Sequence, residues 1–452
     1  MIIDHRRIHI VGVGGAGMSA LARILGAHGH EVSGTDLRGG VVLGDLADLG
    51  IEVATGHHPE IAVRADLVVA SSAVPDHDEE LRAAEAAGIP TWRRPELLEG
   101  LTGAIPTIAA TGTHGKTTTT GMLVMALRSA GVDPSFIIGG ELTTLGTNGH
   151  LGEDDLLVLE ADEAFRTFES LHLRGLVVTS VEPEHLEHFG TSDDLLDSFC
   201  SVAGSVQGPV VICGDDTGAS EVARRCGLPT YGESEGSTWG ISDLARSGDR
   251  TTFTLSGPPG AVAVRLHPPG RHVALNAAGA LALAASLGHD LETLAEGVSR
   301  FRGVSRRWEH RGTISGIVLY DDYAHHPTEV RVTLEAARET GHDRLWAVFQ
   351  PHLYSRTERF ATEFGEALAI ADVVVVTDVY GAREEPVPGV TGELVSEAAR
   401  AAGATVHYVP HRSDLGGFLA ARVRSGDLVL SMGAGDITLL HTELAARLAE
   451  AS

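Results

Sequence analysis

The chain has 452 residues, of which 43% are hydrophobic, and it carries a formal net charge of −27 at pH 7. Its length predicts about three domains of ordinary size. The strong negative charge argues against nucleic acid or an anionic membrane as a partner. If the chain binds polyanionic nucleotides, it must do so with local loops, helix N-termini and metal ions.

The cysteines and the apolar segments indicate a cytoplasmic protein. The three cysteines lack the spacing of metal ligands, and their odd number suits a reducing compartment. The first residues do not have the pattern of a signal peptide, and the longest apolar stretch, residues 277–287, is too short to span a bilayer. We expect a monomer or homodimer with no membrane insertion.

The first block, residues 1–102, predicts a Rossmann-like domain. A strand over 8–13 leads into a glycine turn and a helix over 19–28, and a second strand ends near Asp36. The turn, residues 12–17, fits the G-x-G-x-x-G pattern of dinucleotide binding, with an acidic residue about twenty positions later. The same N–H groups and helix dipole also bind UDP and other diphosphates, and a purely structural turn is a further alternative. His57, Ser71 and Ser72 follow at later loop positions, as turn residues or as ligands.

The central block, residues 103–312, opens with a phosphate-binding loop after a linker at 100–103. A strand over 105–110 and a helix over 117–130 flank Thr111-Gly112-Thr113-His114-Gly115-Lys116-Thr117. Lys116 is the only lysine in a chain with 33 arginines, so this position favours a compact ammonium over a planar guanidinium. In such loops the lysine reaches the β- and γ-phosphates and the next hydroxyl binds Mg²⁺. The strict pattern has glycine where this chain has Ala110.

Two acidic runs follow strands of the central block and predict a magnesium site. Glu160 ends a strand over 156–160, and a strand over 175–180 leads into residues 182–188, which include His185. Ligands collect at the carboxyl ends of parallel strands, and carboxylate oxygens suit Mg²⁺. An acidic surface loop is the alternative for each run taken separately.

The remaining elements complete an α/β protein with mostly parallel sheets and helices on both faces. A β-rich stretch over 237–266 precedes a helix over 275–287, whose start carries His272 and Asn276. The third block, residues 313–452, alternates strands and helices as a second Rossmann-like domain. Two of its strand ends, at 321–327 and 349–357, carry His, Tyr and Arg side chains, which predict a polar rim for a substrate, with helix capping as the alternative.

These runs, in this order, resemble the Mur ligase family over nearly the full chain. The pair DDYAHHPTE (321–329) and QPHLYSRT (350–357) is typical of its alanine-adding member. The markers are GVGGAGMSALA (12–22), SSAV (71–74), TGTHGKTTT (111–119), GGELTTLGTN (139–148), EADE (160–163), RHVALN (271–276), GVSRRWE (303–309), DDYAHHPTEV (321–330), FQPHLYSRT (349–357) and GAGDI (433–437).

The resemblance implies an ATP-dependent amide ligase of peptidoglycan precursor synthesis. ATP phosphorylates the lactyl carboxylate of UDP-N-acetylmuramate, and the amino group of L-alanine then displaces the phosphate. Both reacting groups are anionic, so cations must bring them together.

The resemblance also assigns roles by matching position. The catalytic residues are Lys116, His185, Arg356, His325 and His352. ATP would contact Gly112, Thr113, His114, Gly115, Lys116, Thr117, Thr118, His272, Asn276, Arg307 and Asp322. UDP-N-acetylmuramate and alanine would contact Gly14, Gly15, Ala16, Gly17, Ser19, Asp36, His57, Ser71, Ser72, Asn148, Tyr323 and Arg356. The magnesium ligands are Thr117, Glu160 and His185.

Departures from the family pattern leave the amino-acid acceptor open. They include Ala164, Ser180 and Leu353. Several members use a carbamylated lysine at the second metal, and the single lysine of this chain is already placed in the phosphate loop. The alternatives are the same ligase with glycine, serine or a preformed peptide as acceptor, a non-catalytic nucleotide sensor, and an NAD-dependent oxidoreductase. The last of these leaves Lys116 and Glu160 unexplained.

Overall fold

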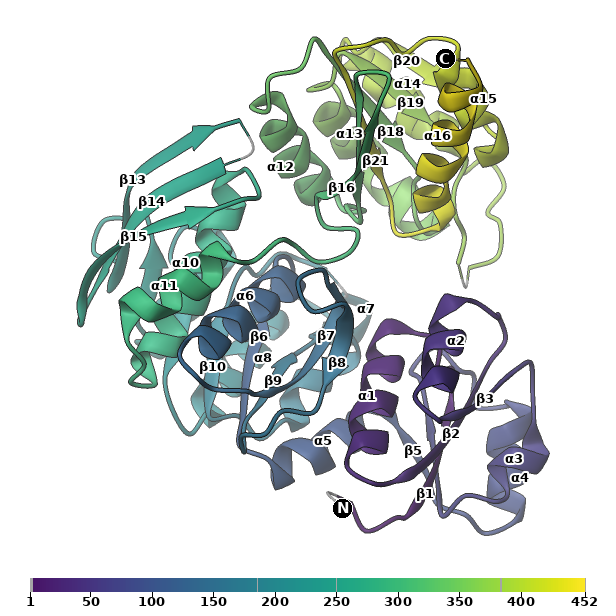
Figure 1. Cartoon of the computed structure of the whole chain (residues 1–452), viewed down its shortest axis with the longest axis vertical. Helices are drawn as coiled ribbons and strands as arrows, with labels where there is room; N and C mark the ends of the chain where they lie inside the picture. The colour runs from purple at the N-terminus through teal and green to yellow at the C-terminus, as the bar shows by residue number, and fades with distance from the viewer. Residues whose placement is uncertain (1–2, 185, 249, 383, 452) are drawn as a thin grey trace. The chain divides into compact units, whose positions relative to one another are not determined.

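The computed structural model describes residues 3–184, 186–248, 250–382 and 384–451 (Figure 1). Its strands form three sheets, of five, ten and six strands. The chain divides into two compact units. The first comprises Met1–Asp243, Phe253–Arg265 and Leu275–Arg302, and the second comprises Leu244–Thr252, Leu266–Ala274 and Gly303–Ser452.

The first sheet has the order β3-β2-β1-β4-β5, and all of its pairs are parallel. Its middle strands read as nearly continuous apolar runs because helices cover both faces. The glycine turn follows β1, the central strand, as in dinucleotide-binding folds. The strands are β1 (Arg7–Val11), β2 (Glu31–Asp36), β3 (Glu52–Thr55), β4 (Leu67–Ala70) and β5 (Thr91–Arg93), and the helices are α1 (Ala16–Ala27), α2 (Val41–Asp48), α3 (Pro59–Ala62), α4 (Glu79–Ala86) and α5 (Arg94–Ala104).

The second sheet has the order β15-β14-β13-β12-β11-β10-β6-β9-β7-β8. Its centre is parallel, so β6, β9 and β10 end at the same edge, where the phosphate loop begins. The strands are β6 (Thr107–Thr111), β7 (Ser135–Leu142), β8 (Thr147–His150), β9 (Leu157–Glu160), β10 (Gly175–Val178), β11 (Val210–Cys213), β12 (Thr230–Gly232), β13 (Trp239–Ser247), β14 (Arg250–Gly257) and β15 (Gly260–Leu266). The helices are α6 (Lys116–Ser129), α7 (Leu186–Phe189), α8 (Ser192–Ser205), α9 (Thr217–Cys226), α10 (Arg271–Ser286) and α11 (Leu291–Ser299), with a 3₁₀ turn at Ala164–Ser170.

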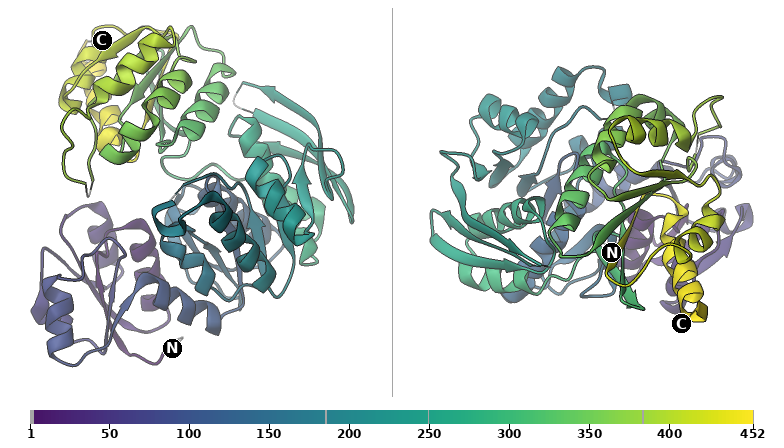
Figure 2. Two further views of the ribbon diagram at one scale, coloured as in Figure 1. Left: turned by 180° about the vertical axis from the view of Figure 1, so that it is seen from behind. Right: turned by 90° about the horizontal axis from the view of Figure 1, so that it is seen from above.

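The third sheet has the order β16-β17-β21-β18-β19-β20, with one antiparallel hairpin, β16–β17, at its edge. Separate apolar clusters pack on its two faces. Helices α12 and α13 cover one face and α15 and α16 the other, and Figure 2 shows helices on both sides of this sheet. The strands are β16 (Glu309–Ile314), β17 (Ile317–Asp322), β18 (Arg344–Phe349), β19 (Val373–Val376), β20 (Val406–Tyr408) and β21 (Asp427–Met432). The helices are α12 (Pro327–Arg338), α13 (Tyr354–Leu368), α14 (Gly392–Ala401), α15 (Leu415–Ala420) and α16 (Leu440–Ala451), with 3₁₀ turns at Arg412–Asp414 and Asp436–Leu439.

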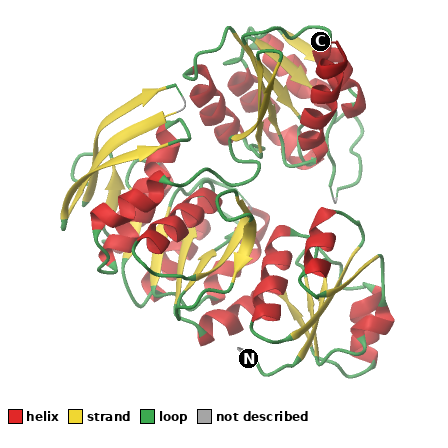
Figure 3. Cartoon of the chain, in the orientation of Figure 1, coloured by secondary structure: helices red, strands yellow, loops and turns green. Residues whose placement is uncertain are grey.

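The predicted fold class, three α/β domains with mostly parallel sheets, is confirmed (Figure 3). The predicted linker at 100–103 is wrong. Those residues lie inside α5, where Leu101 and Thr102 are buried, so their glycines do not interrupt the helix. The hairpin strand β16 begins at Glu309, a few residues before the predicted boundary at 312. No helix within the described residues is long and apolar enough to cross a membrane.

Candidate active site

The phosphate loop joins β6 to α6 and depends on two glycines. Gly112 has φ 127° and Gly115 has φ 82°, which are conformations that other residues rarely adopt. A Cβ on Gly112 would lie 2.3 Å from the Thr179 hydroxyl oxygen, so this position has no room for a side chain. Ala110 pairs in register with Glu160 inside β6 and has no positive φ, which explains why alanine is tolerated there.

The Lys116 ammonium is enclosed by the loop and by the residues after β9. Nζ donates to the Gly112 carbonyl oxygen at 2.7 Å and to Glu163 Oε2 at 2.7 Å, and the side chain is only 12% exposed. Burial lowers the pKa of Lys116, but the nearby carboxylates of Glu163 and Asp162 outweigh it and hold this pKa above its usual value. Lys116 is therefore a fixed positive charge at the end of the sheet.

The predicted magnesium ligands Thr117 and Glu160 lie side by side. The Thr117 hydroxyl donates to Glu160 Oε2 at 2.9 Å, and the Gly139 N–H donates to the same oxygen at 2.9 Å. Such a hydroxyl and carboxylate are ligands that Mg²⁺ accepts, so these residues fit the metal. The third predicted ligand, His185, lies outside the described residues.

The remaining predicted ATP-binding residues of this unit lie in the phosphate loop or next to it. The His114 N–H donates to the Ser180 hydroxyl at 2.9 Å, and Thr113 hydrogen-bonds to Glu182 across the loop. Thr118 lies in the first turn of α6. Asn276, on α10, approaches Gly115 so closely that a Cβ there would lie 2.5 Å from Oδ1. The structure therefore brings Asn276 to the phosphate loop.

His272 lies in the first turn of α10, and burial lowers its pKa to about 4. The imidazole is consequently neutral at pH 7. The ring therefore adds no charge at the start of α10.

In the second unit, the carboxyl ends of β17 and β18 bring together the predicted aromatic and basic side chains. The Tyr323 and His325 rings lie 5.1 Å apart, and the His325 and His352 rings lie 5.8 Å apart. The Arg307 guanidinium lies over the Tyr323 ring at 5.0 Å. Arg356 lies in the first turn of α13.

Asp322, at the end of β17, has a shifted pKa. Burial raises its pKa to about 6, although the Arg307 charge and hydrogen bonds from the Trp308 and Ala324 N–H groups oppose the shift. Leu353, just before α13, has φ 69°. A non-glycine residue in this conformation is uncommon and often marks a functional loop.

In the first sheet, the glycine turn lies against β2. The Gly14 N–H donates to Asp36 Oδ2 at 3.0 Å, so both predicted nucleotide residues are in contact. Ser71 lies close to the turn, 3.1 Å from where a Cβ on Gly12 would stand, and Ser72 follows it. Gly15 is the N-cap of α1 and Gly17 lies in its first turn.

Asn148, on β8, reaches the N-terminus of α1. Its Nδ2 donates to the Ala16 carbonyl at 2.7 Å and to the Ser19 hydroxyl at 3.0 Å. Three predicted substrate residues, Ala16, Ser19 and Asn148, therefore contact one another, and the Asn148 amide nitrogen hydrogen-bonds to α1. His57 contacts a different residue, with Nδ1 3.3 Å from Asp78 Oδ2.

Two charged residues near these sites were not predicted from the sequence. Glu163, within the EADE motif, is the partner of Lys116. Arg94 packs on the glycine turn, and a Cβ on Gly17 would stand 3.0 Å from its guanidinium carbon. Arg94 Nε is buried and has no hydrogen-bond partner among the described residues. In the sequence, the only indication that Arg94 belongs to this site is its position directly after a strand.

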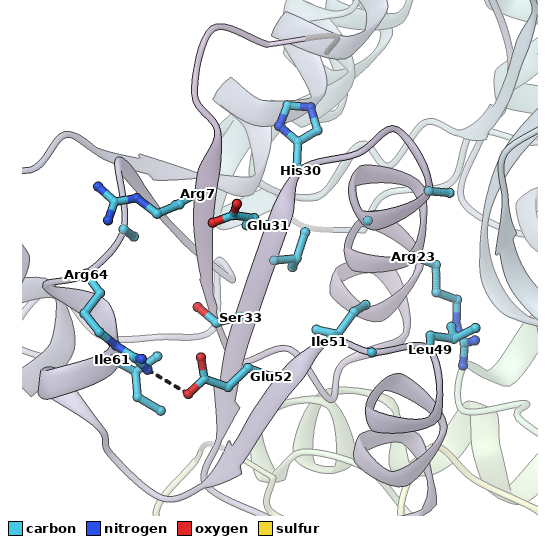
Figure 4. A pocket seen from close by; sticks show the side chains of 15 residues that line it. Arg7, Arg23, His30, Glu31, Ser33, Leu49, Ile51, Glu52, Ile61 and Arg64 are labelled. Carbon is cyan, nitrogen blue, oxygen red and sulfur yellow. Dashed lines mark hydrogen bonds and ion pairs between the residues drawn. The ribbon is translucent and has the colours of Figure 1, made fainter.

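A cavity of about 620 Å³ lies at the edge of the first sheet where the strands begin, opposite the edge that carries the glycine turn (Figure 4). It is lined by residues that start β1, β2 and β3, including Arg7, Glu31 and Glu52. The arginines there are paired, for example Arg64 with Glu52 at 2.7 Å. The cavity is thus separate from the glycine turn and offers little uncompensated charge to an anion.

Comparison with known proteins identifies relatives along the whole chain. Residues 7–104 match the Mur ligase family catalytic domain, residues 110–284 the Mur ligase middle domain, and residues 306–435 the Mur ligase glutamate ligase domain. A UDP-N-acetylmuramate--L-alanine ligase from Thermobifida fusca is 43% identical, over 98% of this chain and 96% of that protein. One of the same name from Kineococcus radiotolerans is 44% identical, over 98% and 96%.

Solved structures agree with this assignment. A UDP-N-acetylmuramate-alanine ligase from Thermotoga maritima has a TM-score of 0.86 and 28% identity, and the match covers 99% of this chain and 100% of that chain. A murein peptide ligase from Psychrobacter arcticus has a TM-score of 0.72 at 24% identity, covering 98% of each chain, and shares the fold.

Proposed function

The chain belongs to the Mur ligase family, and we propose that it joins L-alanine to the lactyl carboxylate of UDP-N-acetylmuramate while ATP is converted to ADP and phosphate. The observation that carries this proposal is the phosphate loop, in which Lys116 is paired with Glu163 and Thr117 contacts Glu160. The reaction would serve peptidoglycan precursor synthesis in the cytoplasm.

The first step requires two anions to approach each other. The lactyl carboxylate oxygen forms a bond to the γ-phosphorus of ATP, and the bond between that phosphorus and the ADP oxygen breaks. Lys116 would neutralise charge on the γ-phosphoryl group, because its ammonium is buried and held in one place. Bound Mg²⁺, held by Thr117, Glu160 and His185, would screen the phosphate charge.

The second step forms the amide bond. The alanine amino nitrogen attacks the carbonyl carbon of the acyl phosphate, phosphate leaves with the C–O bonding electrons, and the nitrogen loses a proton. We assign the orientation of alanine and of the leaving phosphate to Arg356, with Tyr323, His325 and His352. The clustering of the last three at one sheet edge supports this assignment.

The remaining assignments divide by ligand. We propose that His272, Asn276, Arg307 and Asp322 contact the adenosine of ATP. We propose that the N-terminal domain, residues 1–102, binds the uridine diphosphate through its glycine turn, the central domain, residues 103–312, binds ATP, and residues 313–452 receive the amino acid.

The test is phosphate release by the purified chain with ATP, Mg²⁺ and UDP-N-acetylmuramate, and with alanine, glycine, serine or a short peptide as acceptor. Release with alanine well above that with the other acceptors is expected. Faster release with another acceptor would keep the ligase chemistry and change the acceptor. Tight ATP binding without turnover on any acceptor would identify a nucleotide sensor and overturn the proposal.

A further inference from the structure

A buried carboxylate in the N-terminal domain has no role in the chemistry proposed above. Glu80, on α4, is completely buried, with 0% exposure. The Thr35 hydroxyl donates to Oε2 at 2.6 Å, and His9 Nε2 lies 3.0 Å from the same oxygen. Burial raises the pKa of Glu80, but hydrogen bonds from His9 and Thr35 outweigh it and keep this pKa below its usual value. Glu80 is therefore an ionised group that its partners stabilise.

The second carboxylate oxygen of Glu80, Oε1, hydrogen-bonds to a single loop. Oε1 accepts the backbone N–H of His58, in the loop that follows β3. The neighbouring Asp78 holds the same loop, because its Oδ2 lies 3.3 Å from His57 Nδ1. Asp78 Oδ1 accepts the Glu80 N–H at 2.9 Å, so the two carboxylates form one anchor at the start of α4.

This loop lies at the nucleotide edge of the sheet. The Gly56 N–H donates to the Asp36 carbonyl oxygen at 2.8 Å, which ties the loop to the end of β2. In the strand order β3-β2-β1, the glycine turn that receives phosphates follows β1, and the acidic end of β2 lies toward the ribose. The loop after β3 is one strand farther from the phosphates and therefore lies beside the nucleoside.

We propose that Glu80 is a positioning residue that holds the loop at His57 and His58 in the conformation that binds the uridine half of the substrate. The inference rests on the proposed function, because that function places a uridine nucleotide at this edge. Glu80 itself is completely buried and would act through the loop rather than touch the ligand.

The test measures binding of UMP and UDP to the full chain by calorimetry, so that it does not depend on turnover. Glu80→Ala removes the acceptor for the His58 N–H and should weaken UMP and UDP by the same factor, about tenfold, as expected for loss of one hydrogen bond that orders a loop. Glu80→Gln keeps an oxygen that can accept from His58, so its affinities should lie between those of the wild type and Glu80→Ala. The KM for ATP should not change in either variant.

Asp66→Asn is the matched control. Asp66 is in the same domain and accepts three hydrogen bonds from Arg7, but it lies at the opposite edge of the sheet. This variant should bind UMP and UDP like the wild type. A role of Glu80 in general stability alone would lower the folded fraction and the apparent kcat, and would leave the affinity of the folded molecules unchanged.

The outcomes separate the two proposals. A wild-type chain that binds no uridine nucleotide would overturn both the proposed function and this inference. A wild type that binds UDP, with a folded Glu80→Ala or Glu80→Gln variant of unchanged affinity, would overturn the inference alone. An equal rise in the KM for ATP would also overturn it, because the effect would then not be confined to the uridine site.

Discussion

Replacing Lys116 by arginine tests whether the phosphate loop needs a compact ammonium. Nζ is held between the Gly112 carbonyl oxygen and Glu163 Oε2, each at 2.7 Å, and the site is mostly closed to solvent. A guanidinium keeps the charge and adds bulk to a filled site, which costs about 1–3 kcal/mol of unfolding free energy. The donor nitrogens would also move away from the γ-phosphate. Loss of one donor aimed at developing charge costs about 2.7–4 kcal/mol, or about 10²–10³-fold in kcat.

Phosphate release and urea unfolding together measure this prediction. Lys116→Met is the comparison, because it removes the charge and leaves the nearly buried Glu163 carboxylate without its partner, a cost of about 3–5 kcal/mol. We therefore expect Lys116→Arg to be folded and inactive, and Lys116→Met to be inactive and much less stable. A Lys116→Arg enzyme with a kcat within tenfold of wild type would refute the argument from size.

Further predictions concern the other charged and closely packed positions. Arg94→Ala should weaken UDP binding while leaving the much weaker binding of uridine unchanged, measured by calorimetry, since its guanidinium lies at the glycine turn. Glu160→Gln should raise the Mg²⁺ concentration for half-maximal phosphate release, because it removes a metal-binding charge; an unchanged Mg²⁺ titration would contradict the site. The Asp322 pKa is raised from 3.8 to about 6, so between these pH values the native state holds a proton that the unfolded state has lost, and stability falls as pH rises. The stability of Asp322→Asn relative to wild type should therefore rise by on the order of 3 kcal/mol between pH 3.8 and pH 6, by urea unfolding, whatever the pH-independent cost of losing one of the two acceptor oxygens. Gly149→Ala should cost about 1–3 kcal/mol in the same assay, because the new Cβ would lie 2.7 Å from Ala20 Cα.

The sequence predicted those parts of the molecule whose signals are local. The alternation of apolar strands and helices predicted three α/β domains, and the spacing around Lys116 predicted the β6–loop–α6 junction. Thr117 and Glu160 are 43 positions apart in the sequence, yet β6 and β9 are parallel neighbours, so their ends meet as strand order requires.

Features that depend on tertiary contacts were not predictable in this way. Glycines at 100 and 103 indicated a linker, but burial of Leu101 and Thr102 against the protein interior keeps α5 continuous to Ala104. The Lys116–Glu163 pair was missed because nothing in the EADE motif says which carboxylate turns toward the loop. Arg94 was missed because its contact with Gly17 joins segments more than seventy residues apart.

The charges around the phosphate loop account for a buried cation in so acidic a protein and support the proposal that a metal ion joins it there. Lys116 is surrounded by the carboxylates of Glu163, Asp162 and Glu160, so the loop as a whole carries net negative charge. A triphosphate would be repelled from such a loop if Lys116 were its only counterion. We propose that a divalent ion beside Thr117 and Glu160 would offset this negative charge, while Glu163 keeps the ammonium in one position. Under the proposed function, these acidic residues would make nucleotide binding depend on magnesium, and the single lysine would fix the position of the terminal phosphate.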